Sequence, residues 1–188
     1  MSVIDRPALR TRRDELLLIA LAVLERDGSE NFSVGEIARQ AGIKTPSLYK
    51  QFSGKADIQA RLVEHGHTLA AAHFVQALVA LGPDATYRQQ IEGFAFAYRG
   101  WGMDHPQLYR LMMDHDDVRS NLTPGFEQET RGRYAGLFPT ADLARSFWAW
   151  AHGLLSLELA HRIPYDDGVS AADGLWAKLI DVISSQRA

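Results

Sequence analysis

Residues 33–55 read SVGEIARQAGIKTPSLYKQFSGK, and this stretch decides the fold of the N-terminal part of the chain. Ser33, with a glutamate three positions on, is a capping-box pattern that predicts the start of a helix, and the apolar residues after it recur at helical spacing. Gly42 ends this helix. Thr45 and Pro46 then form a predicted N-cap and first-turn pair, so a second short helix begins there. Together the two segments predict a helix-turn-helix unit.

The second of these helices carries side chains that suit DNA. Leu48 and Phe52 lie four positions apart and are predicted to face the first helix. The polar residues around them then point outward, where they can bond base edges or phosphates in the major groove. A third helix opens at Ser53 to Lys55, where a cation and the helix dipole suit a phosphate. The predicted DNA-contacting residues are Ser33, Lys44, Thr45, Pro46, Ser47, Tyr49, Lys50, Gln51 and Lys55.

The distribution of charge agrees with DNA binding, although the formal net charge of the chain is -3. Residues 1–61 hold ten Lys/Arg against eight Asp/Glu, whereas residues 62–188 hold ten against fifteen. The basic excess therefore lies in the predicted helix-turn-helix part. An N-terminal arm with four arginines is predicted to reach phosphates or the minor groove, although a solvated chain end explains any one of them equally well. These arginines are Arg6, Arg10, Arg12 and Arg13.

Two segments resemble one protein family. Residues 9–60 resemble the N-terminal domain of the tetracycline-repressor (TetR/AcrR) family, and the segment FWAWAHGLLSLELAHRI at 147–163 is similar to the Trp-x-x-x-His-Gly signature of one of its C-terminal ligand-domain classes. The family's Leu-Tyr-x-x-Phe-x-x-Lys core falls on Leu48, Tyr49, Phe52 and Lys55. The family usually has Ser-Lys-Gly where this chain has KTP at 44–46, so the family's base contacts are not transferred. The resemblance implies a homodimeric, ligand-responsive regulator that binds a palindromic operator in double-stranded DNA.

The whole chain predicts an all-α fold of about nine helices. Helix-forming residues are broken by Gly and Pro, and no alternating strand pattern or Asn-Gly hairpin turn is present. We expect a helix-turn-helix DNA-binding domain over 1–61 and a helical ligand-binding and dimerisation domain over 62–188, joined within one long helix. The helices are predicted near 8–27, 33–40, 46–51, 54–81, 84–103, 106–115, 124–137, 140–163 and 171–186.

The helix predicted at 140–163 is apolar on nearly all sides, which indicates that it must be covered on all sides. One stripe can line the protomer's own core, and the other then needs a partner, most simply a second copy across a two-fold axis. The alternative is that both stripes pack within one protomer. The predicted dimer interface consists of Phe147, Trp150, Leu154, Leu157, Leu175, Trp176, Leu179, Ile180 and Ile183.

Aromatic and methionine side chains concentrate between residues 84 and 163, together with small residues. Such a mixture is typical of plain core, but it also leaves room for an adaptable cavity with a few orienting hydrogen bonds. The family resemblance favours a pocket for a small, mostly apolar effector. The predicted pocket residues are Tyr98, Trp101, Tyr109, Met112, Phe126, Trp148 and His152.

Several other functions are disfavoured. The chain has no cysteine, and its longest apolar run, Leu16 to Leu24, is too short for a bilayer, which takes roughly 20 residues. We expect no signal peptide and a cytoplasmic protein. No cofactor loop or nucleophile motif is present, and the histidines lack metal-ligand spacing, so we expect no enzyme, cofactor or metal site. The alternative function is a helical small-molecule carrier or enzyme whose helix-turn-helix is only a packing motif.

Overall fold

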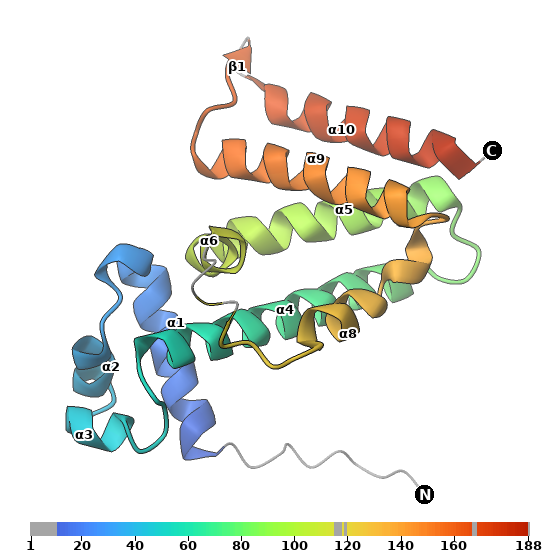
Figure 1. The fold of residues 1–188 in the computed structure, drawn as a ribbon. Helices are drawn as coiled ribbons and strands as arrows, with labels where there is room; N and C mark the ends of the chain where they lie inside the picture. The colour runs from blue at the N-terminus through green and yellow to red at the C-terminus, as the bar shows by residue number, and fades with distance from the viewer. Residues whose placement is uncertain (1–10, 115–117, 119, 167–168, 188) are drawn as a thin grey trace, which may run out of the picture.

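The computed structural model describes residues 11–114, 118, 120–166 and 169–187, and within these ranges it has nine α-helices. The N-terminal part consists of α1 (Arg12–Asn31), α2 (Val34–Gln40), α3 (Thr45–Leu48) and the start of α4 (Lys55–Ala80) (Figure 1). The remaining elements are α5 (Tyr87–Asp104), α6 (Pro106–Asp114), α8 (Phe126–Gly132), the 3-10 helix η1 (Ala135–Leu137), α9 (Ala141–Leu159), α10 (Ala171–Ser184) and the 3-10 helix η2 (Ser185–Arg187). The predicted all-α fold is confirmed.

One small β element departs from the prediction. The two-residue strands β1 (Tyr165–Asp166) and β2 (Val169–Ser170) pair antiparallel between α9 and α10. The sequence carries no hairpin signal here because the segment is too short to show an alternating pattern. These two strands lie where the chain turns back, so that α10 runs along α9, as Figure 1 shows.

Side-chain caps explain where α1, α5 and α9 begin. The Thr11 and Thr86 hydroxyls accept from the backbone amide three residues on. The Asp14 and Gln89 side chains accept in turn from the Thr11 and Thr86 amides, which completes two capping boxes. The Thr140 hydroxyl likewise accepts from the backbone three residues on and so caps α9. These caps place α1, α5 and α9 within a few residues of the predicted starts. At the other end, the helical backbone of α1 is interrupted at Gly28, with φ of +74° and ψ of 167°, directly after the predicted end at residue 27, and helical turns resume up to Asn31.

The helices of the C-terminal half form two layers with α6 beside them (Figure 1). The α4 and α8 helices lie on one side, and α5, α9 and α10 stack on the other. An ion-pair cluster holds the second layer together: Arg99 of α5 bonds Glu158 of α9 at 2.6 Å and Asp173 of α10 at 2.7 Å. The Trp176 indole N–H donates to the same Glu158 carboxylate at 2.7 Å.

The residues predicted for the dimer interface differ in their burial within the protomer, and the interface itself stays a prediction. Six of the nine are at most 6% exposed: Phe147, Leu154, Trp176, Leu179, Ile180 and Ile183. The Phe147 and Trp176 rings lie 6.4 and 6.5 Å from the Tyr98 ring of α5. Trp150 is half-buried against the core, whereas Leu157 and Leu175 are exposed.

Among the helices that the structure describes, none is both long enough and apolar enough to cross a membrane.

Two glycines of α5 are predicted to respond in opposite ways to alanine. A Cβ on Gly102 would come within 2.3 Å of a Leu155 methyl carbon, whereas a Cβ on Gly100 would meet nothing within 4 Å. We expect Gly102→Ala to lower the free energy of unfolding by about 1–3 kcal/mol because Leu155 must move in a packed core. Gly100→Ala should raise it by up to about 1 kcal/mol through helix propensity. Urea unfolding of both variants measures the difference, and equal shifts would contradict the close α5–α9 packing.

Candidate DNA-binding and ligand-binding sites

The turn between α2 and α3 is built from defined backbone bonds. The Ser33 hydroxyl accepts from the Glu36 amide at 3.2 Å and starts α2 as predicted. Gly42 has φ of +64° and ends α2, and the Gly42 and Ile43 amides bond the Arg39 and Ala38 carbonyls at 3.2 and 3.0 Å. This is the Schellman arrangement, which suits glycine in the left-handed region. The predicted helix-turn-helix is therefore formed.

The start of α3 differs from the prediction by one residue. The N-cap is Lys44, not Thr45, and no side chain caps this helix. Thr45 is already helical because the Lys44 carbonyl accepts from the Ser47 amide at 2.8 Å, which places Pro46 at the second helical position. Leu48 is buried, as predicted for the face toward α2.

The predicted DNA-contacting residues lie mostly on the outside of this unit. Thr45 is half-buried, and the other eight are exposed: Ser33, Lys44, Pro46, Ser47, Tyr49, Lys50, Gln51 and Lys55. Tyr49 is 54% exposed although it is a large aromatic residue. The Lys55 ammonium lies 5.9 Å from the centre of the Phe32 ring, which supports its stem while leaving the charge at the surface.

The arginines of the predicted N-terminal arm divide into two pairs. Arg6 and Arg10 lie outside the described residues. Arg12 bonds Glu15 at 2.8 Å on the surface of α1. Arg13 lies 5.1 Å from the centre of the Phe52 ring and 3.8 Å from the Asp57 carboxylate, so it stabilises the junction of α1, α3 and α4.

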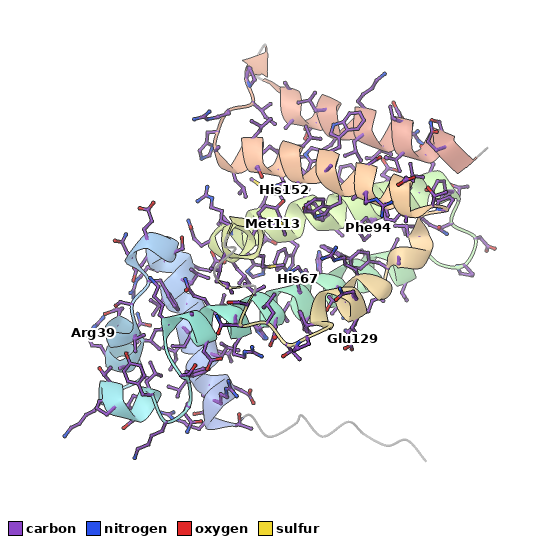
Figure 2. All side chains as sticks on the ribbon, viewed as in Figure 1. Arg39, His67, Phe94, Met113, Glu129 and His152 are labelled. Atoms are coloured by element: carbon purple, nitrogen blue, oxygen red, sulfur yellow. The ribbon has the colours of Figure 1, made fainter. Side chains whose placement is uncertain are left out.

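A cluster centred on Glu36 was not found from the sequence. Its carboxylate bonds Arg39 at 2.7 Å on α2 and Arg26 at 2.8 Å on α1. The Arg39 bond first, and then the Arg26 bond, lower the pKa of Glu36 to about 2. The capping-box interpretation directed this carboxylate back to the Ser33 amide, whereas here it fastens α2 to α1. Arg39 remains 71% exposed in its side chain and projects from the helix-turn-helix unit (Figure 2).

In the C-terminal half, four of the seven predicted pocket residues form one chain of contacts. The Tyr98 and Tyr109 hydroxyls are 2.8 Å apart, and the Tyr109 hydroxyl is 2.7 Å from His152 Nδ1. The Trp148 ring stacks on His152 with centroids 5.6 Å apart and planes 7° apart. Both tyrosines are buried, whereas Trp148 is 51% exposed, so this chain runs from the interior to the surface of α9. Burial, with a smaller effect of Tyr109, raises the pKa of Tyr98 well above its usual range.

The other three predicted pocket residues lie apart from this chain of contacts. Trp101 is 5% exposed, and its indole N–H has no hydrogen-bond partner among the described residues. Met112 is half-buried, with its sulfur only 2.7 Å from where a Cβ on Gly66 of α4 would stand. Phe126 of α8 meets the His67 ring edge to face at 6.1 Å. Figure 2 shows His67 between the two helical layers, on the α4 side.

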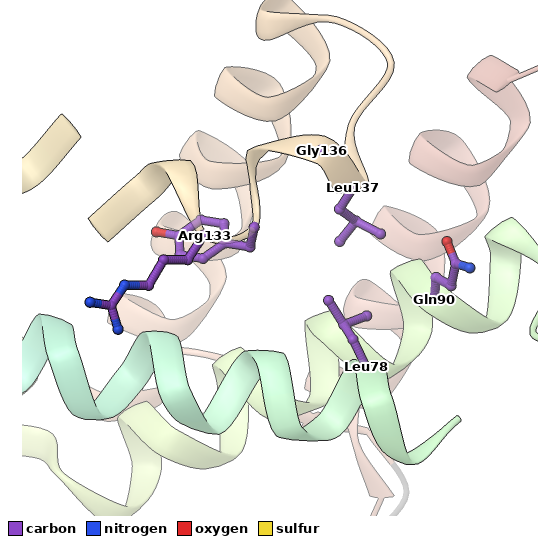
Figure 3. A pocket seen from close by; sticks show the side chains of 6 residues that line it. Leu78, Gln90, Arg133, Gly136 and Leu137 are labelled. Atoms are coloured by element: carbon purple, nitrogen blue, oxygen red, sulfur yellow. The ribbon is translucent and has the colours of Figure 1, made fainter. Parts of the chain in front are cut away.

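A cavity of about 300 Å³ lies at the far end of α4, beneath η1 (Figure 3). Its lining is Leu78, Gln90, Arg133, Tyr134, Gly136 and Leu137, none of which the sequence analysis selected. Tyr134 joins the cavity to the interior, because its ring lies 5.4 Å from Phe94 and 5.9 Å from Phe74. Burial raises the pKa of the Tyr134 hydroxyl. The cavity is assembled from segments far apart in the sequence, so no local pattern marked it.

Two contacts between the N-terminal and C-terminal parts were also not found from the sequence. Glu25 of α1 accepts from the first two free amides of α6, those of Gln107 and Leu108. Arg61 of α4 bonds the Thr123 hydroxyl at 3.1 Å and the Asn121 carbonyl. The partners are 60 or more residues apart, and a single sequence does not pair them. Within the described ranges, no three His, Cys, Asp or Glu side chains are arranged to hold a metal ion.

Comparison with known proteins agrees with this architecture. Residues 16–62 match the family described as bacterial regulatory proteins, tetR family, and residues 91–183 match the tetracyclin repressor-like C-terminal domain. A Mycobacterium tuberculosis protein, the uncharacterized HTH-type transcriptional regulator Rv0681, is 25% identical over 171 residues, which cover 83% of this chain and 73% of that protein.

Solved structures share the fold at lower identity. A tetR-family transcriptional regulator from Streptomyces coelicolor is 20% identical with a TM-score of 0.69, and the match covers 93% of this chain and 81% of that one. The multidrug binding protein EbrR, solved in complex with imidazole, is 18% identical with a TM-score of 0.67, over 93% and 94% of the two chains. The fold and the helix-turn-helix define a DNA-binding transcriptional regulator. The chain belongs to the TetR family.

Proposed function

We propose that this regulator is a homodimeric repressor that a small, mostly apolar effector releases from a palindromic operator. Residues 1–61 form its DNA-binding domain and residues 62–188 its ligand-binding and dimerisation domain. The observation that carries the proposal is the exposed polar face of α3, which packs on α2 and is joined through residues 49–54 to α4, a helix that continues for 26 residues into the aromatic interior. Selection of bound sequences from random duplex DNA tests it, and recovery of no preferred sequence would contradict it.

We expect different roles for Lys55 and Ser47 at the operator. Lys55→Ala should weaken binding to selected and random DNA alike and reduce the slope of log K against log salt by about 0.9, as for one lost phosphate contact. Ser47→Ala should change the preferred sequence and leave the slope unchanged. Fluorescence anisotropy at several salt concentrations measures both. Arg162→Ala, at an exposed position beyond the end of α9, serves as the charge control, and an equal effect there would remove the assignment to Lys55.

The dimer surface is proposed on the exposed faces of α9 and α10. Leu157 and Leu175 are 44% and 40% exposed, and a Cβ on Gly153 of α9 would meet nothing within 4 Å, which leaves room for a close partner. Leu157 and Leu175 belong to the predicted interface, while its buried members support this surface from inside. An exposed apolar face on two adjacent helices is suited to a four-helix contact across a two-fold axis.

A charge on this surface should dissociate the dimer. Leu157→Glu places a carboxylate against a partner at a cost of several kcal/mol, so we expect the dimer dissociation constant to rise 100-fold or more. The fold should persist because Leu157 is exposed within the protomer. Light scattering measures the mass, with Val79→Glu, at a 73% exposed position of α4, as the control. A wild-type protein that is monomeric at tens of micromolar would end this proposal.

We place the effector in the interior between the cavity of about 300 Å³ and the hydrogen-bonded pair Tyr98 and Tyr109. Aromatic side chains connect the two without interruption: Tyr134 contacts Phe74 at 5.9 Å, and Phe74 contacts Tyr98 at 5.8 Å. Rotation of such rings can enlarge a cavity at small cost in polar contacts. The Trp101 N–H, which has no hydrogen-bond partner in the described part of the chain, offers a donor. An effector with a carbonyl or ether oxygen would satisfy this group, which costs about 1–3 kcal/mol when buried unpaired.

Filling the cavity should prevent the effector from releasing the protein from its operator, while DNA binding itself persists. Gly136→Phe adds a ring at a residue of the cavity lining, where a Cβ meets nothing within 4 Å, so we expect the ring to occupy the cavity while the helix-turn-helix is untouched. We expect operator affinity within two-fold of wild type and loss of release by any compound from a panel of apolar ketones, ethers and phenols active on wild type. Gly132→Phe is the control, because a Cβ there would also meet nothing within 4 Å and Gly132 does not line the cavity. Unimpaired release from the Gly136 variant would place the effector elsewhere.

A further inference from the structure

The α6 helix takes its N-terminal cap from the DNA-binding domain. The Gln107 and Leu108 amides donate to the Glu25 carboxylate at 3.1 and 3.0 Å, one to each oxygen. The first amides of a helix have no partner within it and need one from elsewhere. Such a partner is ordinarily a neighbour in sequence, whereas Glu25 lies 82 residues before Gln107, on α1. The position of α6 and that of α1 are therefore linked by charge-assisted bonds.

The first turns of α6 are also held by helices of the C-terminal half, in which we place the effector. Tyr109, directly after Leu108, has its hydroxyl 2.8 Å from Tyr98 of α5 and 2.7 Å from His152 of α9. Leu108 and Met112 press on Gly66 of α4 so closely that a Cβ there would lie 3.1 and 2.7 Å from them. A shift of α6 therefore changes contacts to α5 and α9 on one side and to α1 on the other. Figure 1 shows α6 between the two parts.

The link continues from α1 to α2, the helix on which α3 packs. Arg26, the residue after Glu25, bonds Glu36 of α2 at 2.8 Å, and Glu36 also bonds Arg39. The α2 helix leads through the Gly42 turn into α3. A change in the position of α1 is thus passed to α2 by an ion pair as well as by packing.

We propose that Glu25 is a positioning residue. Through its bonds to α6, a change in the hydrogen bond between Tyr98 and Tyr109 alters the position of the DNA-binding domain. The proposal rests on the effector-responsive function proposed above. An effector that displaces the Tyr109 hydroxyl moves α6, the two amides leave the Glu25 carboxylate or realign on it, and α1 and α2 follow. Glu25 contacts neither DNA nor effector in this scheme.

A double-mutant cycle tests the link without knowledge of the effector. Tyr109→Phe removes only the hydroxyl, and Glu25→Gln removes the charge and one of the two acceptor oxygens. On DNA selected by the wild-type protein, Tyr109→Phe should change the dissociation constant three-fold or more. In the Glu25→Gln background the effect of the same change should be at least about 2.5-fold smaller, which exceeds the roughly two-fold scatter within which independent substitutions add. Additive effects, or no effect of Tyr109→Phe on wild type, would overturn the proposal.

A matched control and a second measurement separate coupling from general destabilisation. Glu30→Gln, at an exposed position of the same helix, should leave the effect of Tyr109→Phe unchanged. Amide exchange followed by NMR should be faster at Gln107 and Leu108 in Tyr109→Phe, with a further rise in α1 that the Glu25→Gln background abolishes. Uniform acceleration along the chain would indicate a merely structural role. If wild type selects no DNA, the proposed function fails, and the exchange experiment still decides the link.

Discussion

The uninterrupted course of α4 is the constraint on which the other features depend. Its 26 residues give a length of about 39 Å. The helix begins shortly after α3 in the sequence and ends at the cavity. The N-terminal and C-terminal parts therefore share one rigid element and have no flexible connection between them at this point. Arg61 adds a second constraint, because its ion pair with Glu64 and its bonds to residues 121–123 hold the connection before α8 against the start of α4. Motion in one half must appear in the other.

Features that depend on neighbours in sequence were predictable. The Ser33 cap, the Gly42 turn and the burial of Leu48 and Phe52 each follow from residues at most four positions apart, and all are present. Thr45 shows the limit of the same reasoning. A threonine before a proline predicts an N-cap, but the backbone starts the helix one residue earlier, and the hydroxyl has no capping role. Whether each exposed side chain touches a base or a phosphate stays a prediction.

The orientation of α9 was not predictable, because a helix that is apolar on all sides contains no local signal for which side faces inward. Glu158 decides it. Its carboxylate accepts from Arg99, 59 residues away, and from the Trp176 indole, 18 residues away. These bonds hold this side of α9, with Leu155 three positions earlier, against α5. Gly102 strengthens the choice, because Leu155 occupies the space that a Cβ would fill. The single carboxylate in an apolar stretch, overlooked among the leucines, was the available signal.

The interior behind these helices has to serve both as core and as a switch, and the strengths of its bonds show that the two roles are compatible. Hydrogen bonds to a charged group contribute about 1.5–3 kcal/mol each, so the two amides on Glu25 hold α6 to α1 by a few kcal/mol. Coupling between two sites in proteins is typically about 1–3 kcal/mol, and complete reversal of a two-state population takes about 5.5 kcal/mol. A link much weaker than this would transmit nothing. One much stronger would leave the effector unable to move the helix.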